Sequence, residues 1–90
     1  MRSKKKDAPK PKIFSEEITE LKYLFLIERI KFGRGETAYE VLHEKADALL
    51  QAIEVRQTQI FGGNTRRRMK LCAAELIANP FFYLSEIPLT

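Results

Sequence analysis

A dense basic cluster, formed by Arg66, Arg67, Arg68 and Lys70, follows a Gly-Gly pair in the second half of the chain. No acidic residue lies between positions 64 and 72. Guanidinium groups bind phosphate through paired N–H donors, and the free amides of a helix N-terminus attract the same anions. The cluster predicts contact with the phosphates of a nucleic acid. Salt bridges to acidic residues and a purely solvated surface are the alternatives.

A second pattern with possible chemistry is the Glu-x-x-His spacing of Glu40 and His43, which di-iron helical bundles use for metal ligands. A bundle metal requires ligands that point along the buried face of their helix. On a helical wheel His43 lies roughly 80° from the apolar line of its helix, and Glu40 lies farther away. We therefore predict no metal site, and we place His43 at the helix surface near Tyr39 and Asp47.

Other catalytic arrangements find little support. His43 is the single histidine, none of the three serines has a histidine beside it, and the glycine pairs lack the strand that precedes a phosphate-binding loop. Cys72 is the only cysteine, which excludes an internal disulfide, and its apolar neighbours predict a small buried side chain. We therefore expect that the chain is not an enzyme and that it uses no cofactor and no small-molecule substrate.

The charge of the chain is concentrated at its start. Residues 1–12 carry six basic side chains against Asp7, a net charge of +5, whereas residues 13–90 carry a net charge of −1. Pro9 and Pro11 favour extended backbone, so these twelve residues are expected to form a flexible basic arm. The arm either contacts nucleic-acid phosphates or acts as a solubilising tail. Its candidate contact residues are Lys4, Lys5, Lys6, Lys10 and Lys12.

The remainder, residues 13–90, is expected to fold as one all-α domain. A body of this size is close to the lower limit for a self-sufficient core, so burial in a homodimer or a larger complex is expected. There is no run of 18 apolar residues and no apolar signal-peptide core. The sequence therefore predicts an intracellular protein, for example a cytoplasmic one, without membrane association.

Apolar periodicity and turn residues predict a small bundle of three helices and a short fourth one. A Thr37-to-Glu40 capping box begins the second helix, whose buried line has Tyr39 and Ile60 near its ends. Pro80 ends the third helix and begins the fourth. The predicted ranges are 15–32, 37–61, 65–78 and 80–85.

The first helix is apolar around most of its middle, which is typical of a helix that is buried on several sides. It therefore predicts either the centre of the bundle or a contact with another protein. The candidate interface combines this helix with the aromatic cluster at 81–84. Its residues are Tyr23, Leu26, Ile27, Ile30, Phe81 and Phe82.

Two functional hypotheses follow. In the first, a small protein binds DNA or RNA through the basic arm and through arginines at the N-terminus of the third helix. In the alternative, the chain is a protein-interaction module, such as an adaptor, inhibitor or assembly subunit, which docks through its first helix and the 81–84 cluster. The sequence does not distinguish DNA from RNA.

Overall fold

A computed structural model describes residues 14–89, which form four helices and no strand. This arrangement confirms the predicted all-α class. The helices are α1 (Phe14–Gly33), α2 (Tyr39–Phe61), α3 (Ala73–Ala78) and α4 (Pro80–Glu86). Residues 1–13 and 90 lie outside the described part of the chain, and so does the predicted basic arm at 1–12. No helix between residues 14 and 89 is both long and apolar enough to cross a bilayer.

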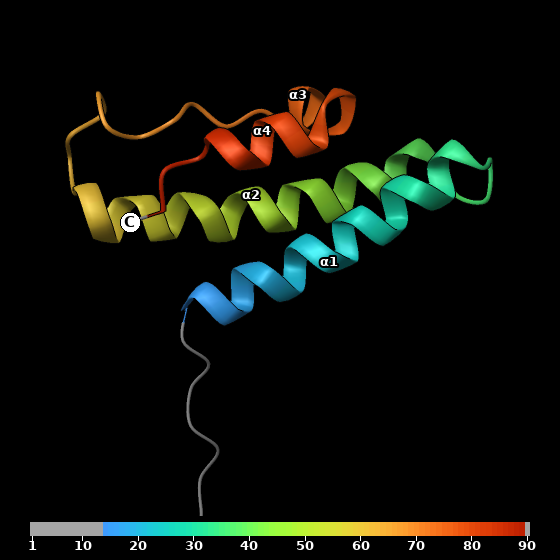
Figure 1. Cartoon of the computed structure of the whole chain (residues 1–90), viewed down its shortest axis with the longest axis horizontal. Helices are drawn as coiled ribbons and strands as arrows, with labels where there is room; N and C mark the ends of the chain where they lie inside the picture. Colours follow the sequence, from blue (N-terminus) through green and yellow to red (C-terminus); the bar gives the residue numbers. More distant parts are fainter. Residues whose placement is uncertain (1–13, 90) are drawn as a thin grey trace, which may run out of the picture.

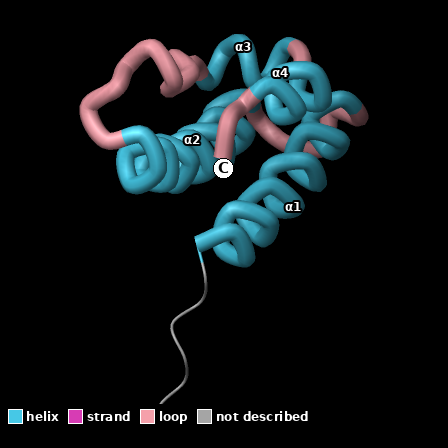
Figure 2. The backbone as a smooth tube through the Cα atoms, turned by 60° about the vertical axis from the view of Figure 1, so that its left-hand side comes forward, coloured by secondary structure: helices cyan, strands magenta, loops and turns pink. Residues whose placement is uncertain are grey.

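The helices are arranged in layers around α2 (Figure 1). α1 packs along α2, and in Figure 1 α3 and α4 lie above α2. The C-terminal part of α1 also reaches α3, where Arg29 bonds the Ile77 carbonyl. The segment between α2 and α3 runs back over α2, and the chain ends beside the C-terminal half of α2 (Figures 1 and 2). The long central helix therefore contributes to both halves of the core.

α1 ends in a Schellman motif at Gly35. The Glu36 N–H donates to the Lys31 carbonyl at 2.8 Å, and the Gly35 N–H donates to the Phe32 carbonyl at 3.0 Å. Gly35 has a φ of 74°, which costs little in a residue without Cβ.

α2 begins two residues later than predicted. Its N-cap is Ala38, in extended geometry and without a side-chain cap hydrogen bond, so the predicted capping box at Thr37 was wrong. The buried line of α2 also differs at its ends, because Tyr39 is exposed and Gln57 is buried. Gln57 is satisfied through its Nε2 atom, which donates to the Pro88 carbonyl at 3.1 Å. The C-terminal segment is thereby fastened to α2.

The predicted third helix was wrong over residues 65–72, because α3 begins only at Ala73. We call residues 62–72 the basic loop. Cys72 precedes α3 in extended geometry, with φ −146° and ψ 121°, and its side chain is half-buried where a buried one was predicted. Positive side chains oppose the dipole of a helix N-terminus, and four of them stand in this short segment. Extended backbone also covers about twice the distance per residue of a helix, which lets the loop run back along α2.

The core joins all four helices. Phe25 of α1, Leu49 of α2 and Leu76 of α3 are fully buried in one cluster. Arg29 of α1 links the layers through its Nε atom, which donates to the Ile77 carbonyl at 2.9 Å. The bond satisfies one of the carbonyls left free at the end of α3. The buried apolar residues are Ile18, Phe25, Leu42, Ala46, Leu49, Leu50, Ile53, Leu76, Ile77, Tyr83 and Ile87.

Candidate interaction surfaces

The basic loop begins with a turn organised by Asn64. Its side-chain oxygen accepts the Arg66 N–H at 3.2 Å, and its carbonyl accepts the Arg67 N–H at 3.2 Å. An Asx turn of this kind offers the backbone an alternative to helix. The turn does not continue, so the arginines lie on an irregular loop. The predicted phosphate site made of helix N-terminal amides is therefore absent from this segment.

Two of the arginines are held against α2. The Arg68 Nη1 atom donates to the Thr58 hydroxyl at 2.8 Å, and that hydroxyl donates to the Glu54 carbonyl at 2.9 Å. The Arg68 Nε atom is buried without a hydrogen-bond partner. The Arg67 guanidinium lies over the Phe61 ring, 5.5 Å from its centroid. Both side chains thus help to position the loop and are less available to an external ligand.

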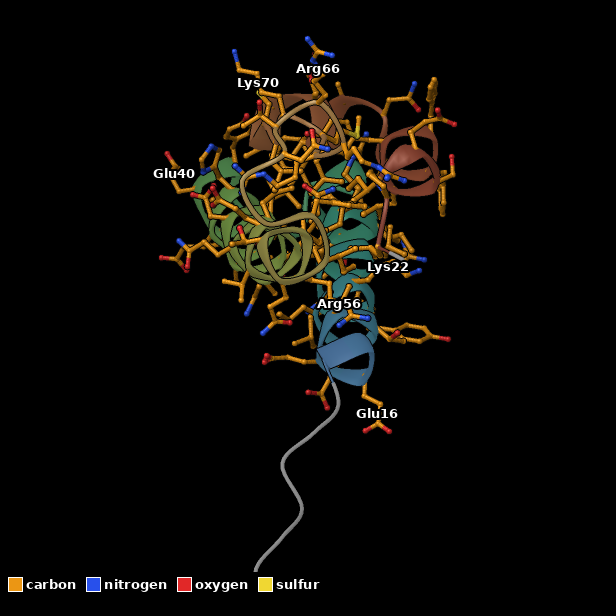
Figure 3. All side chains as sticks on the ribbon, turned by 90° about the vertical axis from the view of Figure 1, so that its left-hand side faces the viewer. Glu16, Lys22, Glu40, Arg56, Arg66 and Lys70 are labelled. Carbon is orange, nitrogen blue, oxygen red and sulfur yellow. The ribbon has the colours of Figure 1, made fainter. Side chains whose placement is uncertain are left out.

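Arg66 and Lys70 behave differently. Both side chains are exposed, and Figure 3 shows them extending to the same side, away from the helices. Neither side chain forms an ion pair with any residue in the range 14–89. Of the four predicted basic contacts in the loop, these two are therefore the ones that project into solvent. The predicted lysine contacts at 4, 5, 6, 10 and 12 lie outside the described residues.

The end of the basic loop is fixed by Tyr83 of α4. The Tyr83 hydroxyl accepts the Cys72 N–H at 2.7 Å and donates to the Lys70 carbonyl at 2.9 Å. Burial raises the pKa of this phenol above its ordinary value of 10.0, and the Cys72 N–H opposes part of that rise. The side chain is buried, so the hydroxyl replaces water as partner for two backbone groups of the loop.

A groove of about 370 Å³ lies between the loop and α2. It presents Arg68 and Lys70, but Glu54 lines it as well. A carboxylate in the same wall opposes an anionic ligand, so the groove itself is poorly suited to phosphate. Its residues are Glu54, Gln57, Thr65, Arg68, Met69, Lys70 and Leu71.

His43 lies where the wheel predicted it, half-buried at the surface of α2. Its Nδ1 atom is 3.0 Å from an Asp47 carboxylate oxygen, and its ring centroid is 5.9 Å from that of Tyr39. Glu40 points outward from α2 (Figure 3). No group of three or more His, Cys, Asp or Glu residues between positions 14 and 89 is arranged to hold a metal ion.

The most apolar exposed surface on a long helix belongs to α1. Tyr23 and Ile30 are 66% and 57% exposed, and Leu24 and Ile27 are about half exposed. On a helical wheel Tyr23, Ile27 and Ile30 lie roughly 140–200° from Phe25, on the side opposite the core. We call Tyr23, Leu24, Ile27 and Ile30 the apolar stripe. Of the interface residues predicted on this helix, only Leu26 lies elsewhere, because it packs partly against the core.

A separate apolar surface occurs on α4, on the other side of α2 (Figure 1). Phe81 and Phe82 are 74% and 54% exposed, whereas the next aromatic residue, Tyr83, is buried. Phe82 lines a mostly apolar groove of about 340 Å³ that carries Glu75 and Glu86 in its wall. The exposed interface residues that the sequence predicted therefore divide between two surfaces: Tyr23, Ile27 and Ile30 lie on α1, and Phe81 and Phe82 lie on α4.

Sequence reasoning missed the residues that give these surfaces their shape. The helix predicted over 65–78 left no place for a turn at Asn64, and Tyr83 was taken only as part of the aromatic cluster at 81–84. A signal for Asn64 was present, because asparagine after a glycine pair favours a local turn. No local signal identifies the backbone groups that the Tyr83 hydroxyl bonds, since these lie eleven and thirteen residues away.

The chain was compared with protein-family models, with curated proteins and with solved structures, and none of them gave a significant match.

Proposed function

We propose that this protein is a non-enzymatic protein-interaction module whose docking surface is the apolar stripe of α1. The observation that carries the proposal is the exposure of Tyr23, Ile27 and Ile30 on the side of α1 opposite Phe25. The core already has its own contacts with α1 through Phe25 and Ile18, so the stripe is not needed to close the fold.

The size and position of the stripe support docking. Four large side chains that are about half exposed present on the order of 400 Å² of apolar surface. A patch of that size matches the largest apolar patch on a typical soluble monomer, and such patches are often functional. α1 also lies at the edge of the fold, since α2, α3 and α4 all lie above it in Figure 1.

Photo-crosslinking at Tyr23 tests this proposal directly. A photoreactive phenylalanine analogue in place of Tyr23 is expected to give a covalent adduct in cells that express the chain. The same analogue at Gln51, an exposed position of α2, is the matched control. Ile27→Lys in the Tyr23-labelled chain should abolish the adduct, because a charge in the middle of a dry contact is costly. Equal labelling from positions 23 and 51 would remove the stripe as a docking surface.

Nucleic-acid binding is a second candidate function, favoured by one observation. Arg66 and Lys70 project from the basic loop in the same direction and form no ion pair with residues 14–89. The basic composition of residues 1–12 supplies further charge for the same kind of partner. In this function Arg67 and Arg68 shape the loop, while Arg66, Lys70 and the arm contact phosphates.

A variant that carries both Arg66→Glu and Lys70→Glu is expected to lose affinity for duplex DNA or structured RNA. Removing two phosphate contacts should lower the slope of log K against log salt by about 1.8 for duplex DNA. Fluorescence polarisation at several salt concentrations measures both quantities. The control reverses Lys22 and Lys45, which lie on α1 and α2. If both double variants lose the same affinity, the loop has no specific part in binding.

A further inference from the structure

The charges that flank the apolar stripe change sign along α1. Glu16, Glu17 and Glu20 stand in the N-terminal third of the helix, while Lys31 lies in its last turn and Arg34 follows directly. The stripe lies between these ends. A helix with this layout is complementary to a second copy that runs in the opposite direction, because each acidic end then meets a basic end. A parallel copy would place like charges together.

The register of such a pair follows from the spacing. Glu20 and Arg34 lie seven residues before and after Ile27, or about 10 Å in each direction along the helix. A two-fold axis beside Ile27 therefore brings Glu20 of one copy opposite Arg34 of the other. In the same register Ile30 lies opposite Leu24 of the second copy, and the two Ile27 side chains meet at the axis.

The existing partner of Arg34 does not prevent this contact. Arg34 Nη1 is 3.9 Å from a Glu36 carboxylate oxygen, and both side chains are more than half exposed. Exposed ion pairs of this length contribute little, so the guanidinium can also serve a second carboxylate. The apolar centre and the polar ends therefore fit one interface.

We propose that two copies of this chain pair antiparallel through α1, centred on Ile27, an inference that rests on the proposed function of the apolar stripe. The two stripes together bury on the order of 800 Å² of apolar surface, which with the flanking residues is at the low end for a specific interface. We expect such a small interface to dissociate in roughly the micromolar range. It supplies the additional burial that a chain of ninety residues is expected to need.

Sedimentation over a concentration series tests the pair, and a charge exchange tests its direction. Arg34→Glu should weaken the dimer roughly tenfold, since two contacts per dimer become repulsive. Adding Glu20→Arg should restore most of the affinity, because the antiparallel pair then keeps opposite charges. Lys22→Glu, on the flank of the same helix, is the control and should change affinity less than twofold. A double variant no tighter than Arg34→Glu alone would overturn the antiparallel register.

The outcome for Ile27 separates this inference from the proposed function. Ile27→Glu brings two carboxylates together at the axis, so the variant should sediment as a folded monomer at every concentration. If the unmodified chain is monomeric at every concentration, the proposed antiparallel dimer is wrong. In that case the Tyr23 adduct decides the proposed function by itself: an adduct with a different protein retains the docking surface, and the absence of any adduct removes it. An adduct between two copies supports both.

Discussion

Replacement of Phe25 with alanine is expected to lower the free energy of unfolding by about 3–5 kcal/mol. Phe25 is 0% exposed and lies in the middle of α1, on the face that packs against α2. The substitution removes the apolar contacts of the ring and leaves a cavity that the rigid core fills only in part. For a domain of this size the melting temperature should fall by roughly 15–30 °C.

Thermal and urea unfolding followed by circular dichroism measure this loss. Phe81→Ala is the matched control, because the same ring is removed from a position that is 74% exposed. The control should change the free energy of unfolding by no more than about 0.5 kcal/mol. The two variants should be compared at low micromolar concentration, so that any association does not add to their stability. Similar losses in both would contradict the placement of Phe25 in the core.

Tyr83→Phe should cost about 1–3 kcal/mol, although it removes a single oxygen atom. The variant leaves the Cys72 N–H and the Lys70 carbonyl without the partner that they share in the folded chain. It should also release the basic loop, so that trypsin cleaves after Arg66, Arg67 or Lys70 several-fold faster. Urea unfolding and timed proteolysis measure the two effects. Tyr39→Phe, which changes a phenol on the exposed part of α2, is the control.

The Tyr83 phenol should also make the free energy of unfolding depend on pH in the alkaline range. Burial raises the pKa of Tyr83 above 10.0, so the folded state holds this proton more tightly than the unfolded state does. Its contribution is complete below about pH 10 and is lost as the pH rises through the folded-state pKa. The difference in stability between the unmodified chain and Tyr83→Phe should therefore shrink above pH 10. A difference that stays constant up to pH 11 would show that the hydroxyl is not buried in its hydrogen bonds.

Three of the helices were accessible to sequence reasoning because their signals are local. The helical spacing of apolar residues in α1 and α2 is a property of each segment and does not depend on the rest of the chain. Pro80 marks the start of α4 directly. The basic loop was mistaken for helix because Met69, Cys72 and Leu76 follow helical spacing. The sequence showed that positive charges at the start of this segment disfavour a helix. The loop that forms instead is held by a hydrogen bond from the distant Tyr83 hydroxyl to the Lys70 carbonyl.

The candidate surfaces were predictable to a similar extent. The exposure of Tyr23, Ile27 and Ile30 follows from a helix that is apolar on more sides than one neighbour can cover. Which of the consecutive aromatics at 81–83 is buried depends on how α4 docks, and the sequence does not determine that. Likewise, four adjacent cations predict a basic surface, but only the folded chain distinguishes Arg68, bonded to Thr58, from the projecting Arg66.

The Schellman turn at Gly35 implies a hierarchy among the parts of this fold. It joins α1 and α2 as neighbours in sequence, so their pairing requires the closure of only a short loop, which carries a small entropic cost. α3 and α4 depend instead on distant bonds, such as the one from Gln57 to Pro88 across 31 positions. We therefore expect the helical hairpin to form first and the C-terminal helices to dock after it and open before it. Such an opening would expose the far side of α2 while the apolar stripe keeps its geometry.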